Sequence, residues 1–208
     1  MQFASSIGSS LLSLAMVIWL SSVASGVTPR NLFTTQWSTF VVDSEGLLYA
    51  CGRNHQGQLG VGDQTERTSP TRVGVGGVVT VSNVTGVCGS VAEDAGWTLI
   101  AADGRVFFSG KSSLSPPSPS FSTSPVLVLG LDDAKGVACP SSTSTEMFAW
   151  NSSGHLFSWG SGLLGRGSAS ESAALPVELQ IPSAFESGGV LEEVTGCLGP
   201  LYGMNTRA

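Results

Sequence analysis

The residues that most often carry catalysis are scarce in this chain and form no recognisable constellation. His55 and His155 are the only two histidines, and no shared motif joins them to a nucleophile or a carboxylate. The motifs of serine hydrolases (GxSxG), phosphate-binding loops (GxxxxGKS or GxxxxGKT), zinc peptidases (HExxH) and dinucleotide-binding folds do not occur. We therefore predict a protein that is not an enzyme, with no catalytic, cofactor-binding or metal-binding residues.

Two pairs of adjacent carboxylates are the remaining candidates for acid–base chemistry, Asp132-Asp133 and Glu192-Glu193. Adjacent residues of a strand point to opposite faces, so neither pair easily brings two carboxylates to one substrate. We interpret both pairs as solvated residues of connecting loops.

Cysteine thiols are the other reactive side chains, at Cys51, Cys88, Cys139 and Cys197, with spacings of 37, 51 and 58 residues. No two of them form a CxxC pair, which argues against a zinc site. An even number of cysteines suits two disulfides in an exported protein.

The amino-terminal segment resembles a secretory signal. The first 29 residues contain no charged side chain, and the apolar run Leu11–Leu20 is followed by the small residues Ser21–Gly26. Residues 1–26 are therefore expected to be a signal peptide, although no Lys or Arg precedes the apolar run. Two alternatives stay open: an uncleaved membrane anchor over residues 7–27, or a wrongly assigned amino terminus on a cytoplasmic or nuclear protein.

If the chain enters the secretory pathway, Asn83 and Asn151 become candidate N-glycosylation sites, since they begin the patterns Asn83-Val84-Thr85 and Asn151-Ser152-Ser153. The predicted protein is then a secreted glycoprotein.

Composition and charge favour a turn-rich β protein. The chain has 27 Gly and 10 Pro, 41% apolar residues and only 12% charged residues, which disfavours both disorder and long helices. Its 9 basic and 15 acidic residues give a net charge of −6. This balance argues against binding to nucleic acid or anionic membranes, which depends on clustered Lys and Arg.

Internal repetition is the strongest signal in the sequence. Three segments share an apolar run, a polar turn ending in glycine, and a second apolar run closed by another glycine: 42–52, 101–110 and 151–160. The turn glycines are Gly46, Gly104 and Gly154, and the closing glycines are Gly52, Gly110 and Gly160. Each segment is typical of a β-hairpin.

Two further landmarks recur in step with the hairpins. The first is a short predicted strand opened by proline, at Pro70–Val73, Pro125–Val128 and Pro176–Leu179. The second is a predicted strand of small residues, at Gly86–Ser90, Gly136–Pro140 and Gly196–Pro200. A unit of about 50 to 60 residues with four short strands has the size of one propeller blade.

The first unit carries a long motif, GLLYACGRNHQGQLGVGD at residues 46–63, followed by Pro70–Val73. It resembles a repeat of the regulator of chromosome condensation family. The third unit keeps GHLFSWG at 154–160 and a shortened GLLGRG at 162–167, whereas a Ser/Pro-rich stretch replaces the glycine-rich loop of the second. The resemblance covers residues 35–200 and is strongest in the first third.

The glycines of the motif loop, Gly57, Gly60 and Gly62, and its counterpart Gly165, lie where the chain must turn sharply between strands. Leu59 is expected to plug this loop onto the blade. Tryptophan buries a large area for a small loss of side-chain rotamer entropy, so we expect Trp37, Trp97 and Trp159 to pack between blades. Equivalent positions in neighbouring blades are expected to lie too far apart for a Cys88–Cys139 disulfide, so buried free thiols are predicted.

The resemblance implies an all-β, partial β-propeller of about three four-stranded blades, either an open arc or a fragment of a seven-bladed ring. The predicted organisation places it at 27–208, with units of about 35–85, 86–135 and 136–195 and the start of a fourth, and a Ser/Pro-rich insertion at 112–124. A seven-bladed ring needs roughly 360 residues, so the length suggests a fragment, or half a ring closed by self-association.

Function is expected to reside in the loops, because propellers of this kind display loops for partner recognition. The leading prediction is a non-enzymatic protein–protein interaction module that contacts an unknown protein partner through Arg53, Asn54, His55 and Gln56. Family analogy implies an alternative, a guanine-nucleotide exchange factor or regulator of a small GTPase, although no wedge insertion or basic tail is recognisable. A second alternative is a truncated or decayed paralogue without independent function.

Overall fold

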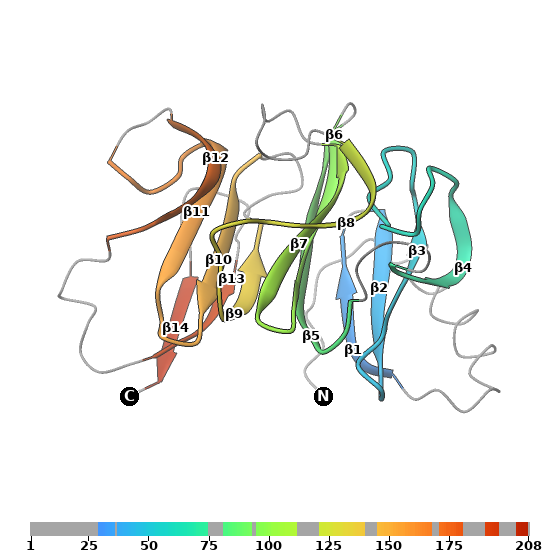
Figure 1. Cartoon of the computed structure of the whole chain (residues 1–208), viewed down its shortest axis with the longest axis horizontal. Helices are drawn as coiled ribbons and strands as arrows, with labels where there is room; N and C mark the ends of the chain where they lie inside the picture. The colour runs from blue at the N-terminus through green and yellow to red at the C-terminus, as the bar shows by residue number, and fades with distance from the viewer. Residues whose placement is uncertain are drawn as a thin grey trace.

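The computed structural model describes the main part of the chain as strands joined by turns and loops. The described residues are 29–35, 37–74, 81–92, 95–111, 121–139, 145–167, 171–180, 190–195 and 203–207. They form three four-stranded antiparallel sheets and one two-stranded sheet, and the three larger sheets stand side by side in an open arc (Figure 1). Within these ranges no helix is long and apolar enough to cross a membrane. The predicted signal segment, residues 1–26, lies outside the described residues.

Each of the larger sheets follows the chain from its first strand to its fourth without a crossover. The first contains β1 (Pro29–Thr34), β2 (Ser38–Asp43), β3 (Leu48–Gly52) and β4 (Arg67–Arg72). The second contains β5 (Val84–Ala92), β6 (Ala95–Ala102), β7 (Arg105–Lys111) and β8 (Phe121–Leu127). The third contains β9 (Ala134–Ala138), β10 (Met147–Asn151), β11 (Leu156–Gly162) and β12 (Glu171–Glu178), and the two-stranded sheet pairs β13 (Val190–Thr195) with β14 (Gly203–Arg207). The predicted all-β, propeller-like fold is confirmed.

The three predicted hairpins are the middle pairs of the sheets, β2–β3, β6–β7 and β10–β11. Their turn glycines all have positive φ, the region that glycine enters without a steric penalty: Gly46 80°, Gly104 71° and Gly154 85°. The turns themselves differ. Asp43 and Asn151 close long turns by accepting backbone N–H bonds from Leu47 and His155, whereas Ala102 pairs directly with Arg105 across a two-residue turn.

The closing glycines show why the repeat keeps them. Gly52, Gly110 and Gly160 have φ of 112°, 105° and 104°. A Cβ at each would collide with a backbone carbonyl at or just before the start of the paired strand, that of Trp37, Gly96 and Thr145 respectively. These carbonyl oxygens mark equivalent positions in the three sheets.

The proline-containing strands are the outermost strands β4, β8 and β12, where a missing N–H breaks no ladder. They begin earlier than predicted: each proline, Pro70, Pro125 and Pro176, lies inside the strand, where the pairing register shifts. For the same reason the expected insertion at 112–124 is too long. Residues 121–124 form the first half of β8 and pair with β7, while 112–120 lie outside the described residues.

A bulge in the first strand of every sheet is a repeat feature that the sequence reading missed. In each case one extra residue stands opposite a regular partner strand: Arg30 in β1, Thr85 in β5, Lys135 in β9 and Glu192 in β13. A bulge bends and twists its strand. The first strands lie beside one another, β1 by β5, β5 by β9 and β9 by β13, so neighbouring sheets are close along this edge, which we call the concave side of the arc.

The two larger hydrophobic clusters lie between neighbouring sheets, and a smaller one lies on the third sheet. One cluster joins Phe40, Val42 and Leu48 of the first sheet to Ile100 and Phe107 of the second. A second joins the next two sheets, with Trp97, Leu99, Val106, Val137, Met147 and Trp159 among its members. The predicted inter-blade packing of Trp97 and Trp159 is confirmed, as each is 1% exposed. For Trp37 it is wrong, because this side chain is 46% exposed.

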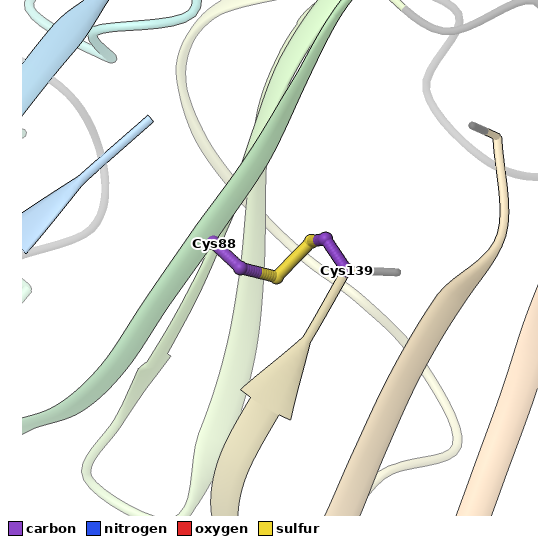
Figure 2. Close-up of a disulfide and its surroundings, with 2 residues drawn as sticks. All are labelled: Cys88 and Cys139. Atoms are coloured by element: carbon purple, nitrogen blue, oxygen red, sulfur yellow. A yellow bond between two sulfur atoms is a disulfide. The ribbon is translucent and has the colours of Figure 1, made fainter. Parts of the chain in front are cut away.

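The expectation of free thiols at Cys88 and Cys139 is also wrong. The two residues form a disulfide between β5 and the residue that follows β9, with their Cα atoms 5.7 Å apart (Figure 2). Equivalent positions of neighbouring blades diverge toward the outside of the arc but converge on its concave side, and both cysteines lie on that side. Cys51 is free and buried, and Cys197 lies outside the described residues.

Candidate functional site

The loop that carries the sequence motif, residues 53–66, connects β3 to β4 and is organised around one buried amide. Asn54 is fully buried. Its Nδ2 donates to the carbonyls of Asp63 (2.9 Å) and Thr65 (3.1 Å), and its Oδ1 accepts the backbone N–H of Leu59 (3.0 Å). One side chain therefore ties the start, middle and end of the loop together.

An ion pair closes the far end of the loop. Arg67 lies 2.6 Å from the Asp63 carboxylate. The pKa of Asp63 lies below its usual range, first because Arg67 donates a hydrogen bond to the carboxylate and second because the Thr65 backbone N–H does. The carboxylate thus stays ionised and keeps both donors in place at neutral pH.

The loop also binds the neighbouring sheet. Its Gly62 N–H donates to the carbonyl of Thr123 in β8 (2.8 Å), and the buried Ser109 hydroxyl of β7 donates to the carbonyl of Gln58 (3.2 Å). Leu59 is fully buried in the cluster between the first two sheets, as predicted for a plug. The loop is therefore held at both ends and in its middle, and its exposed side chains stand on a rigid support.

Trp37 and Arg53, with the exposed His55 that follows two residues later in the loop, make up what we name the Trp37 patch. Trp37 immediately precedes β2 and Arg53 immediately follows β3, so the Ser38–Gly52 pair holds them side by side. The Arg53 N–H donates to the Trp37 carbonyl (3.0 Å), and the Arg53 guanidinium lies over the indole, 5.9 Å from the ring centroid. His55 is exposed, and its carbonyl accepts a hydrogen bond from Gln64 (2.8 Å).

The predicted contact residues separate into two groups. Arg53 and His55 belong to the patch, whereas Gln56 is half-buried, lies near Gly96 of β6 and has its N–H bound to the Gln58 side chain (2.9 Å). Asn54 cannot touch a partner, because its side chain is enclosed by the loop. The sequence signal that could have identified Asn54 as structural is its place inside the motif. The corresponding signal for Trp37 is that the matching positions of the other two units, Gly96 and Thr145, hold no aromatic residue.

The Trp37–Arg53 pair is not part of the repeated design. The residues whose carbonyls face the closing glycines in the second and third sheets are Gly96 and Thr145, neither of which is aromatic. The third sheet keeps the plug, since Leu164 is fully buried where Leu59 lies in the first, but its loop is shorter. The second and third sheets form without such a pair, so the fold does not require it and it is available for binding.

The other candidate groups do not assemble into a site. His55 follows β3 of the first sheet and His155 precedes β11 of the third, where it lies 3.5 Å from Glu178. Asp133 accepts the Ser152 hydroxyl at a turn, and Asp132 is exposed. Glu192 and Glu193 belong to β13, not to a loop. Among the described residues no group of three or more His, Cys, Asp or Glu side chains could hold a metal ion.

The two candidate glycosylation asparagines both lie beside hairpin turns. Asn83 is exposed and donates its amide to the Asp103 carboxylate (2.7 Å), so its attachment atom is engaged in the folded chain. Asn151 is half-buried and uses its Oδ1 to accept the His155 N–H (2.9 Å). Modification of either residue stays a prediction.

Comparison with known proteins gives consistent matches. The family model for the regulator of chromosome condensation (RCC1) repeat matches residues 45–90. A mouse protein described as RCC1-like G exchanging factor-like protein is 31% identical over 157 residues, and its human counterpart is 30% identical. Each alignment covers 71% of this chain and 31% of the relative, so the chain spans about a third of the length of these curated relatives.

Solved structures show the same fold. Human WBSCR16 superposes with a TM-score of 0.66 at 24% identity, over 81% of this chain and 43% of the other. Prp20p of Saccharomyces cerevisiae superposes with a TM-score of 0.61 at 18% identity, over 81% and 41%. Yeast RCC1 (Prp20) in its complex with Kap60 gives 0.63 at 18% identity, over 86% and 43%.

Proposed function

Because this chain is a protein of the regulator of chromosome condensation repeat family, we propose that it is a non-enzymatic protein-binding module whose contact surface is the Trp37 patch. The observation that carries the proposal is the Arg53 guanidinium held over a Trp37 ring that is 46% exposed. Tryptophan and arginine are enriched among the residues that dominate binding energy at protein interfaces.

The geometry favours a partner segment with two chemical features. An apolar or aromatic side chain fits against the free face of the indole, and a carboxylate or carbonyl oxygen fits beside the guanidinium, which accepts planar, bidentate partners. The rigid loop beneath the patch lowers the ordering cost of binding, because Asn54 and Leu59 already hold it in one conformation.

Similar proteins support a role in protein binding. The solved relatives are described by their binding to proteins: Prp20p to Gsp1p and histones, and yeast RCC1 to Kap60. For the present chain we propose a class of partner: a protein surface that offers an apolar or aromatic side chain next to a carboxylate or carbonyl oxygen.

Site-specific photocrosslinking tests the patch on the full chain. A photoreactive amino acid replaces His55 in one variant and Glu66, an exposed residue at the far end of the same loop, in the other. We expect protein adducts from position 55 only, and we expect Trp37→Ala or Arg53→Ala to abolish them. With the captured partner purified, Trp37→Ala should weaken binding roughly tenfold or more, as hot-spot truncations do, and Glu66→Ala less than twofold. Adducts that persist without Trp37 and Arg53, in variants whose thermal unfolding matches the parent chain, would refute the proposal.

A second candidate function is regulation of a small GTPase, favoured by the relatives described as G exchanging factor-like proteins. Release of a fluorescent GDP analogue from a panel of GTPases tests it. Acceleration by the full chain, abolished in the Trp37→Ala variant, would give the patch this specific role. Acceleration that the variant retains would place exchange activity elsewhere on the chain.

We also propose that the chain travels the secretory pathway. The support is a disulfide, which forms and persists mainly in oxidising compartments, together with the uncharged, apolar amino-terminal segment. Expression in a secreting host tests this route. We expect the chain in the medium, and a glycosidase-sensitive mass that falls when Asn83→Gln or Asn151→Gln is introduced. Retention of an unglycosylated chain in the cytosol would count against it.

A further inference from the structure

We propose that Cys88 and Cys139 form a thiol–disulfide exchange site that joins the second and third sheets and is opened and closed by dithiol–disulfide reagents. The site lies between β5 and the residue that follows β9 (Figure 2). It is separate from the Trp37 patch, and it stands or falls independently of the proposed function.

The two cysteines lie on parts of the chain that are packed against each other over more than the disulfide itself. β5 and β9 pack against each other along the concave side. Two residues before Cys88, a Cβ at Gly86 would lie 3.4 Å from the Val137 backbone nitrogen and 3.7 Å from the Gly136 Cα. These are ordinary van der Waals separations, so β5 and β9 lie close together two residues before Cys88. The Cα separation of 5.7 Å at the cysteines falls in the usual range for a disulfide.

Cys51 shows what an unreactive thiol looks like in the same protein. It lies in β3, 7% exposed, and burial raises the pKa of its thiol. Thiol–disulfide exchange requires a thiolate and access by the reagent. Cys88 and Cys139 are each half-buried at the edge of the cluster between the second and third sheets, so both are more accessible than Cys51.

The chemistry needs only a disulfide oxidant, such as glutathione disulfide. One thiolate attacks a glutathione sulfur, forms a mixed disulfide and releases one glutathione thiolate. The second cysteine thiolate then attacks the protein sulfur of that mixed disulfide and releases the second glutathione. Two cysteine thiols become one disulfide, and one glutathione disulfide becomes two glutathione thiols. A dithiol reductant opens the disulfide: one of its thiolates attacks a cysteine sulfur and releases the other cysteine thiolate, and its second thiolate then displaces the bound cysteine as the reductant closes to a cyclic disulfide.

Closure of the site restrains the inter-sheet cluster. Both cysteines pack against this cluster, which contains Trp97, Val137 and Trp159. The crosslink spans 51 residues of sequence and holds the β5–β9 edge while the sheets pack. A loop of this length restricts the unfolded chain enough to change the unfolding equilibrium roughly 100- to 1,000-fold. Reduction is expected to leave the fold intact but to loosen the strands at this edge.

Peptide mapping of the full chain is the first test. The protein is denatured with an alkylating reagent present and digested without reductant, before and after equilibration with glutathione disulfide and then dithiothreitol. We expect one crosslinked peptide pair containing Cys88 and Cys139, lost with dithiothreitol and regained with glutathione disulfide. Cys51 should alkylate only after denaturation. A crosslink of Cys88 or Cys139 to Cys197, or two free thiols after oxidation, would overturn the proposal.

Unfolding measurements test the consequence. In urea unfolding, we expect dithiothreitol to raise the unfolding equilibrium constant of the wild-type chain roughly 100- to 1,000-fold. The unfolding of the Cys88→Ser/Cys139→Ser variant should not respond to dithiothreitol. Cys51→Ser is the matched control and should respond like the wild type. If the double variant does not fold, hydrogen exchange of the wild type supplies the result. Faster exchange in β5 and β9 than in β2 and β3 on reduction supports the proposal, and equal exchange contradicts it.

Discussion

At the scale of single residues, Asp103 and Asn83 show how the sheets are joined at the hairpin turns. Asn83 and Asp133 precede the first strands of the second and third sheets, and both have the positive φ that is uncommon outside glycine, 49° and 58°. Each meets the hairpin turn of the preceding sheet, at Gly46 and Gly104. Asp103, in the second of these turns, accepts hydrogen bonds from Ser82 (2.6 Å) and Asn83 (2.7 Å).

These bonds give Asp103 a predictable pH dependence. Hydrogen bonds from Ser82 first, and then Asn83, hold the pKa of the Asp103 carboxyl below its usual range. The stabilisation is fully present above the unfolded pKa of about 3.9 and is lost as the pH falls through the lower folded value. Between pH 5 and pH 3 the wild type should therefore lose more thermal stability than Asp103→Asn, which tolerates the positive φ of 51°. Asp132→Asn, at an exposed neighbouring carboxylate, is the control. Parallel curves for wild type and Asp103→Asn would contradict this prediction.

At the scale of elements, the loops after the first and third hairpins are each attached by one buried leucine. The plug is Leu59 in the first sheet and Leu164 in the third, and both are fully buried. The third-sheet loop keeps this attachment although it is shorter, and the Ser158 hydroxyl donates to the Leu164 carbonyl (2.8 Å). The plug was predictable from sequence, because a large apolar side chain between the glycines of a loop is expected to be buried against the sheet rather than exposed to water.

Two adjacent leucines test the plug within one loop. Leu164→Ala removes a fully buried side chain and should lower the free energy of unfolding by about 2–5 kcal/mol. Leu163→Ala changes a side chain that is 47% exposed and should cost under about 0.5 kcal/mol. Urea unfolding followed by circular dichroism measures both. Equal losses in the two variants would mean that the loop is not attached through Leu164.

At the scale of the whole molecule, the sheets are coupled to their neighbours through shared clusters. The cluster between the second and third sheets contains Trp159, and that between the first and second contains Phe40. In repeat architectures each unit contacts only its neighbours, so a change in one interface should weaken the adjoining sheets most.

Trp159→Ala tests this coupling. Loss of a side chain that is 1% exposed should cost about 3–5 kcal/mol. Amide hydrogen exchange should accelerate in β6, β10 and β11 more than in β2 and β3, which lie one interface away. Trp37→Ala removes the same side chain from the exposed patch and should leave strand exchange unchanged. Uniform acceleration across all strands after Trp159→Ala would show that the three sheets open as one unit.

The sequence by itself determined the hairpins, their glycines, the outer proline strands and the family of the repeat. These features follow from local requirements: alternation along a strand, positive φ at a turn and a missing N–H at an edge. Asn54 and Trp37 show the limit of such reasoning. Both lie at the same loop, yet the polar Asn54 is enclosed by it and the aromatic Trp37 is 46% exposed.

Only the tertiary structure decided which residues of different sheets meet. Equivalent positions of neighbouring blades are expected to lie too far apart for a disulfide, yet Cys88 and Cys139 are bonded because the first strands converge on the concave side of the arc. The bulge residues Arg30, Thr85 and Lys135 could not be predicted from the sequence for the same reason, because a bulge is defined only by the pairing with a partner strand. Distances between sheets depend on twist and packing summed over many residues, and no short stretch of sequence records that sum.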